Sequence, residues 1–119
     1  MKTLLIFICL FLYSPLIRAQ FLIEGHVTDD KGSPVAGANI ILSKTSAATV
    51  ANYDGYFKLP IEGVQGKVIL SITFIGYQQA EAEITLEENY NYHVTATLLK
   101  KKRHGKSSEI TVEKTPINK

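Results

Sequence analysis

Few side chains in this chain of 119 residues have the chemistry of a metal centre. His26, His93 and His104 are its only histidines. His26 and His93 fall on the outward faces of two expected strands, where they could form a zinc pair. A zinc centre needs a fuller tetrahedral set of ligands. Two surface histidines without a third ligand therefore favour an ordinary surface over a metal site.

Residues for nucleophilic catalysis are also scarce. Such catalysis needs an activated Ser or Cys beside a positioned base. The chain has one cysteine, Cys9, and has neither a Gly-x-Ser-x-Gly elbow nor a glycine-rich phosphate loop. Cys9 lies in an N-terminal segment that we expect to be removed. The sequence thus predicts a protein that is not an enzyme and that binds no cofactor.

Three aspartates are candidates for a loose Ca²⁺ site. Asp29, Asp30 and Asp54 supply the oxygen ligands that Ca²⁺ prefers, but their spacing lacks the EF-hand pattern. All three stand in segments rich in Gly, Pro or Asn, where Asp commonly bonds the backbone of a turn. Turn formation is the simpler interpretation of these residues.

Four tyrosines are candidates for an aromatic surface that stacks on sugars. Tyr90 and Tyr92 fall on the inward face of an expected strand, so we assign them to the core. Tyr56 and Tyr77 remain as candidates for binding a carbohydrate or a peptide.

The N-terminal residues 1–19 have the pattern of a secretory signal peptide. A basic start at Lys2 precedes a continuous apolar run at residues 4–12, and the segment ends on the small residue Ala19. The alternative is a membrane anchor. The apolar run is shorter than the roughly 20 residues that a span requires, which favours a leader cleaved after Ala19.

The charge of the remaining chain is divided between two segments. Residues 20–99 hold four Lys and nine acidic residues, whereas residues 100–119 hold seven basic and two acidic residues. The basic run at residues 100–106 is typical of a solvated linker, and it could also attract anionic lipid or lipopolysaccharide. Export argues against a nucleic acid as the partner. We expect a folded body at 20–99 and a basic tail at 100–119.

Residues 20–99 have the sequence pattern of a series of short strands. Apolar and polar residues alternate between turns spaced about 8–12 residues apart, which predicts an all-β, seven-stranded antiparallel β-sandwich. The expected strands are 21–28, 38–43, 55–59, 67–75, 77–86 and 90–98, with brief pairing at 49–51. Pro60 is expected to end the pairing of its strand.

Two glycine-containing turns organise the series. Asp54-Gly55 is a strong hairpin signal, because Gly accepts a positive φ. Gly76 follows the most apolar strand, where it predicts a kink or a bulge.

The tail contains a second strand-like segment. Six residues from 109 to 114 have the composition of a short strand with no partner nearby, and they are candidates for recognition by strand addition. They are Glu109, Ile110, Thr111, Val112, Glu113 and Lys114. The alternative is a frayed C-terminus.

Four blocks in order resemble a known family. They are GHVTD at 25–29, GSPVAGANI at 32–40, DGYFKL at 54–59 and SITFIGY at 71–77. Together they are similar to the carboxypeptidase-like regulatory domain, a transthyretin-like sandwich, and the resemblance covers residues 21–99. Asn52, Ala51 and Val35 depart from the usual Asp, Thr and Leu of the family pattern.

The resemblance implies a non-catalytic module. Such domains follow signal peptides at the N-terminus of TonB-dependent outer-membrane transporters of Bacteroidetes-type bacteria, and the segment at 109–115 is similar to a TonB box. The implied partner is a protein, either an outer-membrane transporter or an energy-coupling protein, in the periplasm or at the outer membrane. A stand-alone carbohydrate- or peptide-binding domain and an accessory domain of a secreted peptidase remain open, as does whether the chain is part of a transporter.

Overall fold

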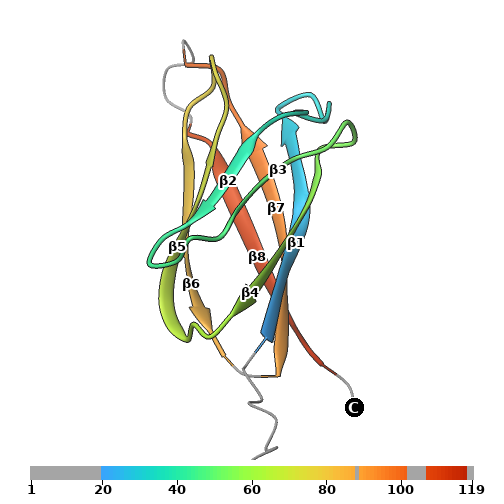
Figure 1. Ribbon diagram of the computed structural model, residues 1–119. Coiled ribbons are helices and arrows are strands. Elements are labelled where there is room, and N and C mark those ends of the chain that lie inside the picture. The colour runs from blue at the N-terminus through green and yellow to red at the C-terminus, as the bar shows by residue number, and fades with distance from the viewer. Residues whose placement is uncertain (1–19, 88, 102–106, 118–119) are drawn as a thin grey trace, which may run out of the picture.

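The computed structural model describes residues 20–87, 89–101 and 107–117 (Figure 1). The predicted signal peptide and most of the predicted basic run lie outside these ranges. Within them the chain forms eight strands and no helix. None of the described residues therefore forms a helix that could cross a membrane.

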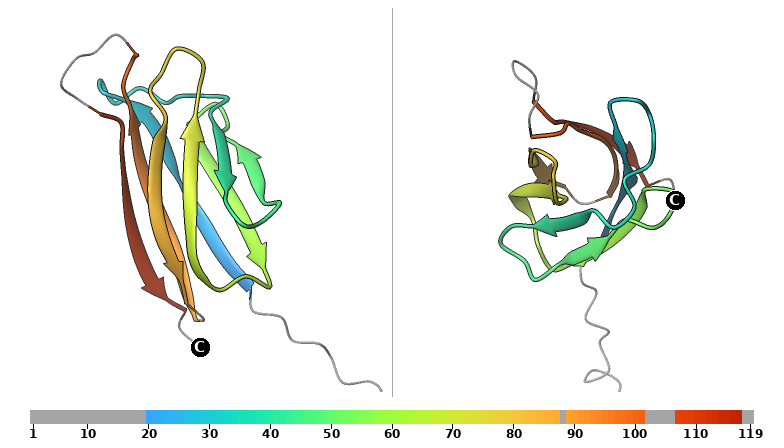
Figure 2. Two further views of the ribbon diagram at one scale, coloured as in Figure 1. Left: turned by 90° about the vertical axis from the view of Figure 1, so that its left-hand side faces the viewer. Right: turned by 90° about the horizontal axis from the view of Figure 1, so that it is seen from above.

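The strands form two four-stranded sheets that pack face to face (Figure 2). Sheet A has the order β4 (Tyr56–Glu62), β1 (Gln20–Asp29), β7 (Tyr90–Leu98) and β8 (Glu109–Pro116). Sheet B has the order β3 (Ala48–Val50), β2 (Asn39–Leu42), β5 (Gly66–Thr73) and β6 (Ala80–Leu86). The predicted β-sandwich is confirmed.

Two details of the predicted sandwich were wrong. The described residues contain eight strands, because the segment after the basic run joins sheet A as β8. The sheets are also not wholly antiparallel, since β1 and β7 run parallel, with Ile23 opposite Tyr92. These two strands are separated by the whole of sheet B in the sequence, so no hairpin fixes their relative direction.

The core is built from the inward faces of both sheets. Along β4 and β5 exposed and buried residues alternate strictly enough to identify the inward set from the sequence. Among the largest fully enclosed side chains are Ile23, Val27, Ile40, Leu42, Phe57, Leu70, Ile72, Val94 and Leu98. No buried side-chain nitrogen or oxygen of the described residues lacks a hydrogen-bond partner.

Tyr92 of sheet A is hydrogen-bonded to the end of β6 in sheet B. The ring of Tyr92 is buried, and its hydroxyl donates to the carbonyl of Thr85 (2.9 Å) and accepts from the amide of Glu87 (2.8 Å). The residue therefore contributes both apolar area and two polar contacts to the end of β6. Its predicted place in the core is confirmed.

Pro60 does not end β4, contrary to the expectation. The strand continues to Glu62, and Pro60 lies opposite Leu22 of β1. The amide of Val27 donates to the carbonyl of Gly55, so Gly55 and every second residue after it bond β1. The residues between them therefore direct their backbone N–H and C=O groups away from β1. These are Tyr56, Lys58, Pro60 and Glu62, of which Pro60 has no N–H. Because its nitrogen faces the open edge, Pro60 removes no hydrogen bond from the sheet.

Candidate interaction surfaces

The predicted recognition segment lies at an edge of sheet A. All eight residues of β8 pair antiparallel with β7, from Glu109 opposite Thr97 to Pro116 opposite Tyr90. The expectation that this strand has no partner nearby was therefore wrong. The predicted recognition segment is therefore itself an edge strand of sheet A.

The free edge of β8 can be assigned from one hydrogen bond. The amide of Ile117 donates to the carbonyl of Asn89 (2.8 Å), which continues the register of the β7–β8 pair. Antiparallel strands alternate between residues that bond the neighbour and residues that face away. Ile110, Val112 and Lys114 therefore direct their backbone N–H and C=O groups outward.

The side chains of β8 contribute little to the core. Ile110 and Val112 are half-buried and pack against it, whereas Glu109, Thr111 and Glu113 are exposed. The strand is thus attached mainly through its backbone.

One ionic contact fastens the end of β8. Lys114 Nζ lies 2.8 Å from Glu87 Oε2 and 4.5 Å from the ring centre of Tyr90. The hydrogen bond to Glu87 raises the pKa of Lys114 above its ordinary value. Both side chains of the ion pair are 47% exposed, so solvent weakens the attraction.

A serine fastens the beginning of the strand. Ser108 Oγ accepts from the amide of Leu99 (3.0 Å) and donates to the carbonyl of Gln78 (2.9 Å). These bonds join three segments at one end of the sandwich. Neither Ser108 nor Glu87 was singled out in the sequence, because Ser108 bonds Gln78 across 30 residues and Glu87 bonds Lys114 across 27 residues of the chain.

A turn forms at Asp54-Gly55, but it is not the predicted hairpin, because β3 and β4 lie in different sheets and another residue stabilises the turn. Asn52 Oδ1 accepts from the amides of Asp54 (2.9 Å) and Tyr56 (3.0 Å). Gly55 has φ +74°, and a Cβ there would come within 2.4 Å of the carbonyl of Val27. The position thus requires glycine for its conformation and for the space beside β1.

Gly76 occupies the predicted turn after β5. It has φ +88°, and the amide of Tyr77 donates to the carbonyl of Phe74 (3.1 Å). The residue before it, Ile75, is 93% exposed. Alternation in the expected strand at 67–75 places Ile75 on the face opposite Leu70 and Ile72, but β5 ends at Thr73 and Ile75 lies in the turn beyond it.

The two described histidines are neighbours on the outer face of sheet A. Their ring centres lie 6.2 Å apart, and His26 also lies 5.3 Å from the ring of Tyr56. His104 lies outside the described residues. No group of three or more potential metal ligands occurs among the residues that the structure describes.

Asp29 has the turn role expected of it. Its Oδ1 accepts from the amides of Ser33 and Lys31, each at 2.9 Å. The hydrogen bond from the Ser33 amide is the largest cause that lowers the pKa of Asp29, followed by the bond from the Lys31 amide and then by the charges of Lys31 and Lys100. The carboxylate therefore already has partners within its own loop.

The four tyrosines do not form one strip. Tyr56 donates to Glu24 Oε2 (2.7 Å) on the outer face of sheet A, and this bond raises the pKa of Tyr56. Tyr77 and Tyr90 are half-buried and pack against the core. An extended aromatic surface for sugars is therefore not present among these residues.

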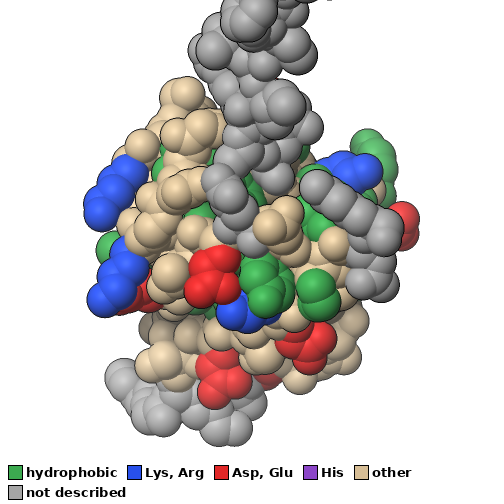
Figure 3. Space-filling model, turned by 90° about the horizontal axis from the view of Figure 1, so that it is seen from below, with side chains coloured by type: hydrophobic (Ala, Val, Ile, Leu, Met, Phe, Trp, Pro, Cys, Tyr) green, Lys and Arg blue, Asp and Glu red, His purple; other side chains and the backbone are tan. Residues whose placement is uncertain are grey.

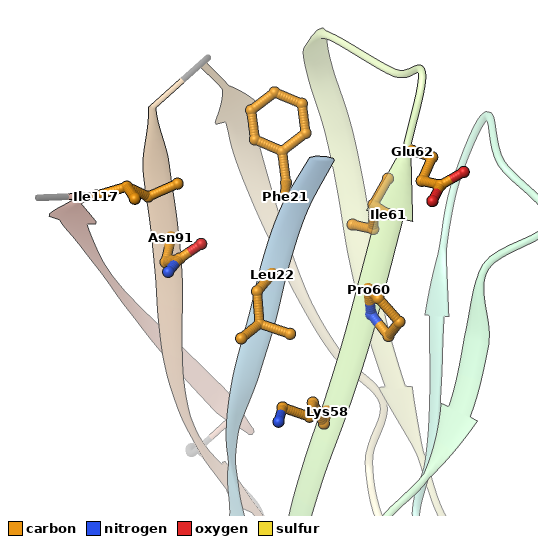
Figure 4. Close-up of a pocket in the computed structure, with 8 residues that line it drawn as sticks. All are labelled: Phe21, Leu22, Lys58, Pro60, Ile61, Glu62, Asn91 and Ile117. Carbon is orange, nitrogen blue, oxygen red and sulfur yellow. The ribbon is translucent and has the colours of Figure 1, made fainter. Parts of the chain in front are cut away.

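A hollow of about 510 Å³ lies near the beginning of β1. Figure 4 shows its lining residues on β1, β4 and β7 and just after β8, with Glu62 pointing away from Asn91. Seen from below, the molecule shows small separate groups of apolar, acidic and basic side chains (Figure 3). The polar groups of the hollow do not converge as they do in a binding site with a defined orientation for its ligand.

The sequence and fold together decide the family. The profile of the CarboxypepD_reg-like domain matches residues 23–112, from the first strand into β8. The chain belongs to the CarboxypepD_reg-like domain family. The resemblance drawn from the four sequence blocks is confirmed, and the match extends beyond residue 99 into the edge strand.

Two curated relatives are receptors. The chain is 36% identical over 89 residues to the TonB-dependent receptor SusC of Bacteroides thetaiotaomicron. It is 31% identical over 84 residues to the TonB-dependent receptor P39 of Formosa agariphila. The matches cover 74% and 67% of this chain but only 9% and 8% of the receptors. The chain thus corresponds to a small part of these much longer proteins.

A solved structure supports the fold alone. Catechol 1,2-dioxygenase of Acinetobacter radioresistens matches with a TM-score of 0.54 and 12% identity, over 76% of this chain and 55% of that one. At this identity the likeness concerns the arrangement of strands and not the chemistry.

Proposed function

We propose that this domain is a non-catalytic, exported interaction module that serves TonB-dependent transport. It would act in the periplasm or at the outer membrane, with a transporter or an energy-coupling protein as its partner. The similarity to two TonB-dependent receptors supports this role. The family is described as a regulatory-like domain, which supports a role without catalysis.

The partner binds, in this proposal, by adding a strand to the outer edge of β8. The supporting observation is the uninterrupted series of outward backbone groups at Ile110, Val112 and Lys114. An extended peptide gains main-chain hydrogen bonds at such an edge, and side chains on alternate positions give specificity. The strand need not leave sheet A to act.

The exposed charged side chains of β8 would let this edge discriminate between partner strands. Glu109 and Glu113 point away from the core, whereas Lys114 falls on the opposite face of the strand, where its ammonium group is paired with Glu87. Charged side chains on an edge strand oppose unspecific pairing between copies of the chain. A partner strand with a matching order of charges would be preferred.

Two proline variants test the edge directly. Lys114→Pro removes an outward amide of β8, and Lys58→Pro removes an outward amide from the opposite edge of the same sheet. We expect Lys114→Pro to lose capture of the transporter or coupling protein from membrane extract, and Lys58→Pro to retain it. Lys114→Ala keeps the amide and should also retain capture.

A truncation supplies the second test. Deletion from Ser107 onward removes β8 completely and should abolish capture of the same partner, identified by mass spectrometry. Circular dichroism of each variant establishes that the sandwich is folded. Unchanged capture by a folded Lys114→Pro variant or by the truncated chain would contradict the proposal.

A further inference from the structure

Ile75 is an apolar side chain held out into solvent. It stands at the tip of the turn that follows β5 and is 93% exposed. The turn is firm, because Phe74 and Tyr77 on either side of Ile75 and Gly76 pack against the core with ring centres 5.9 Å apart. Ile75 is thus presented by a supported turn and not by a long loop.

Two lysines adjoin this turn through the backbone. The amide of Lys101 donates to the carbonyl of Gly76 (3.1 Å), and Lys100 forms a bridge with Tyr77. The amide of Gln78 donates to the carbonyl of Leu99 (2.7 Å), which fixes this short pairing. Both lysines are exposed. One corner of the sandwich therefore combines an apolar tip with two cations, of which Lys100 also interacts with the carboxylate of Asp29. We call Ile75, Lys100 and Lys101 the Ile75 corner.

The Ile75 corner differs from the other exposed tip at the same end of the molecule (Figure 1). Tyr53 is also 93% exposed, but it lies between Asn52 and Asp54 in a turn that has no basic residue. The two tips match in exposure and differ in the charge beside them. An anionic surface would attract the first tip and not the second.

We propose that the Ile75 corner binds the surface of an anionic phospholipid bilayer. The Ile75 side chain enters the boundary between headgroups and acyl chains, and Lys100 and Lys101 attract the negative headgroups. With one apolar side chain, the binding is reversible and weakens as salt increases. This inference rests on a different surface from β8 and does not depend on the proposed strand addition.

Vesicle flotation tests the proposal with the chain purified after export. The probes are vesicles of phosphatidylcholine alone and vesicles of phosphatidylcholine with an equal part of phosphatidylglycerol, at low ionic strength. We expect binding to the second vesicles only. Each of Lys100→Gln and Lys101→Gln should weaken it about fivefold, the effect of roughly one surface charge.

Two further variants distinguish binding through the Ile75 corner from a general electrostatic attraction between the chain and the vesicles. Ile75→Ser should weaken binding several-fold without changing the charge, whereas Tyr53→Ser should leave it unchanged. Absence of binding to anionic vesicles would overturn the proposal. Equal losses with Tyr53→Ser and Ile75→Ser would also overturn it, because the two tips would then act alike.

Discussion

The two edge strands of sheet A are attached in different ways. In β4, Phe57, Leu59 and Ile61 are all buried, with at most 3% of each exposed. In β8 no side chain is buried, and only Ile110 and Val112 reach the core. Side-chain burial therefore holds β4, whereas backbone pairing holds β8.

The unpaired edges of β4 and β8 also differ in how many backbone amides they offer to an added strand. Pro60 interrupts the outward amides of β4, which blunts that edge against an added strand. In β8 the outward proline, Pro116, stands only at the end of the strand, so the outward amides of Ile110, Val112 and Lys114 follow one another without interruption. The comparison indicates that β4 completes the fold and that β8 is available for recognition.

The largest effect is expected at the centre of β4. Phe57→Ala should reduce the free energy of unfolding by about 3–5 kcal/mol, because it leaves a cavity in the core. Urea denaturation followed by circular dichroism measures this loss. A loss below about 1 kcal/mol would mean that β4 is no better anchored than β8.

The turn that leads into β4 should be almost as sensitive. Gly63→Ala is a matched control for Gly55→Ala, since φ is +73° and +74° but a Cβ at Gly63 has nothing within 4 Å. We expect Gly63→Ala to cost about 1 kcal/mol for the backbone conformation. Gly55→Ala should cost at least twice as much, because the new Cβ collides with Val27. Equal costs would show that the close approach to β1 does not matter.

A smaller effect is expected in β8. Val112→Ala removes two methyl groups from a half-buried position and should lower the free energy of unfolding by about 1 kcal/mol. The same denaturation experiment compares it with Phe57→Ala. A loss as large as that of Phe57→Ala would contradict the light attachment of β8.

The smallest effect concerns the ion pair at the end of β8. The pKa of Lys114 is raised above its ordinary value of 10.5, so the pair stabilises the fold fully below that pH. The stabilisation is lost as the pH rises through the folded-state pKa. Glu87→Gln should return the pKa of Lys114 toward 10.5, which an NMR titration of the side chain detects. An unchanged midpoint would show that the contact does not form in solution.

Local patterns predicted most of the fold. The alternation in 55–59 and 67–75 identified the inward faces of β4 and β5, and the Asp54-Gly55 and Gly76 turns occur where expected. These features depend on residues close together in the sequence. The family blocks then identified the sandwich to which the strands belong.

Features that depend on distant residues were not predictable in the same way. The pairing of β8 with β7 joins segments across the basic run, and its only apolar sign is the alternation of Ile110 and Val112. Asn52 departs from the Asp of the family pattern, and its role in accepting two backbone hydrogen bonds of the turn is visible only in the structure. The exposure of Ile75 and the edge position of Pro60 follow from the topology, which composition does not specify.

Hydrogen exchange of the β8 amides tests the central claim most directly. In the free chain, the amides of Ile110, Val112 and Lys114 should exchange fast, and those of Thr111 and Glu113 slowly. On binding of the captured partner, the three outward amides should become protected while the other two stay protected. If the outward amides remain fast, or if Thr111 and Glu113 lose their protection, the partner does not add a strand to this edge.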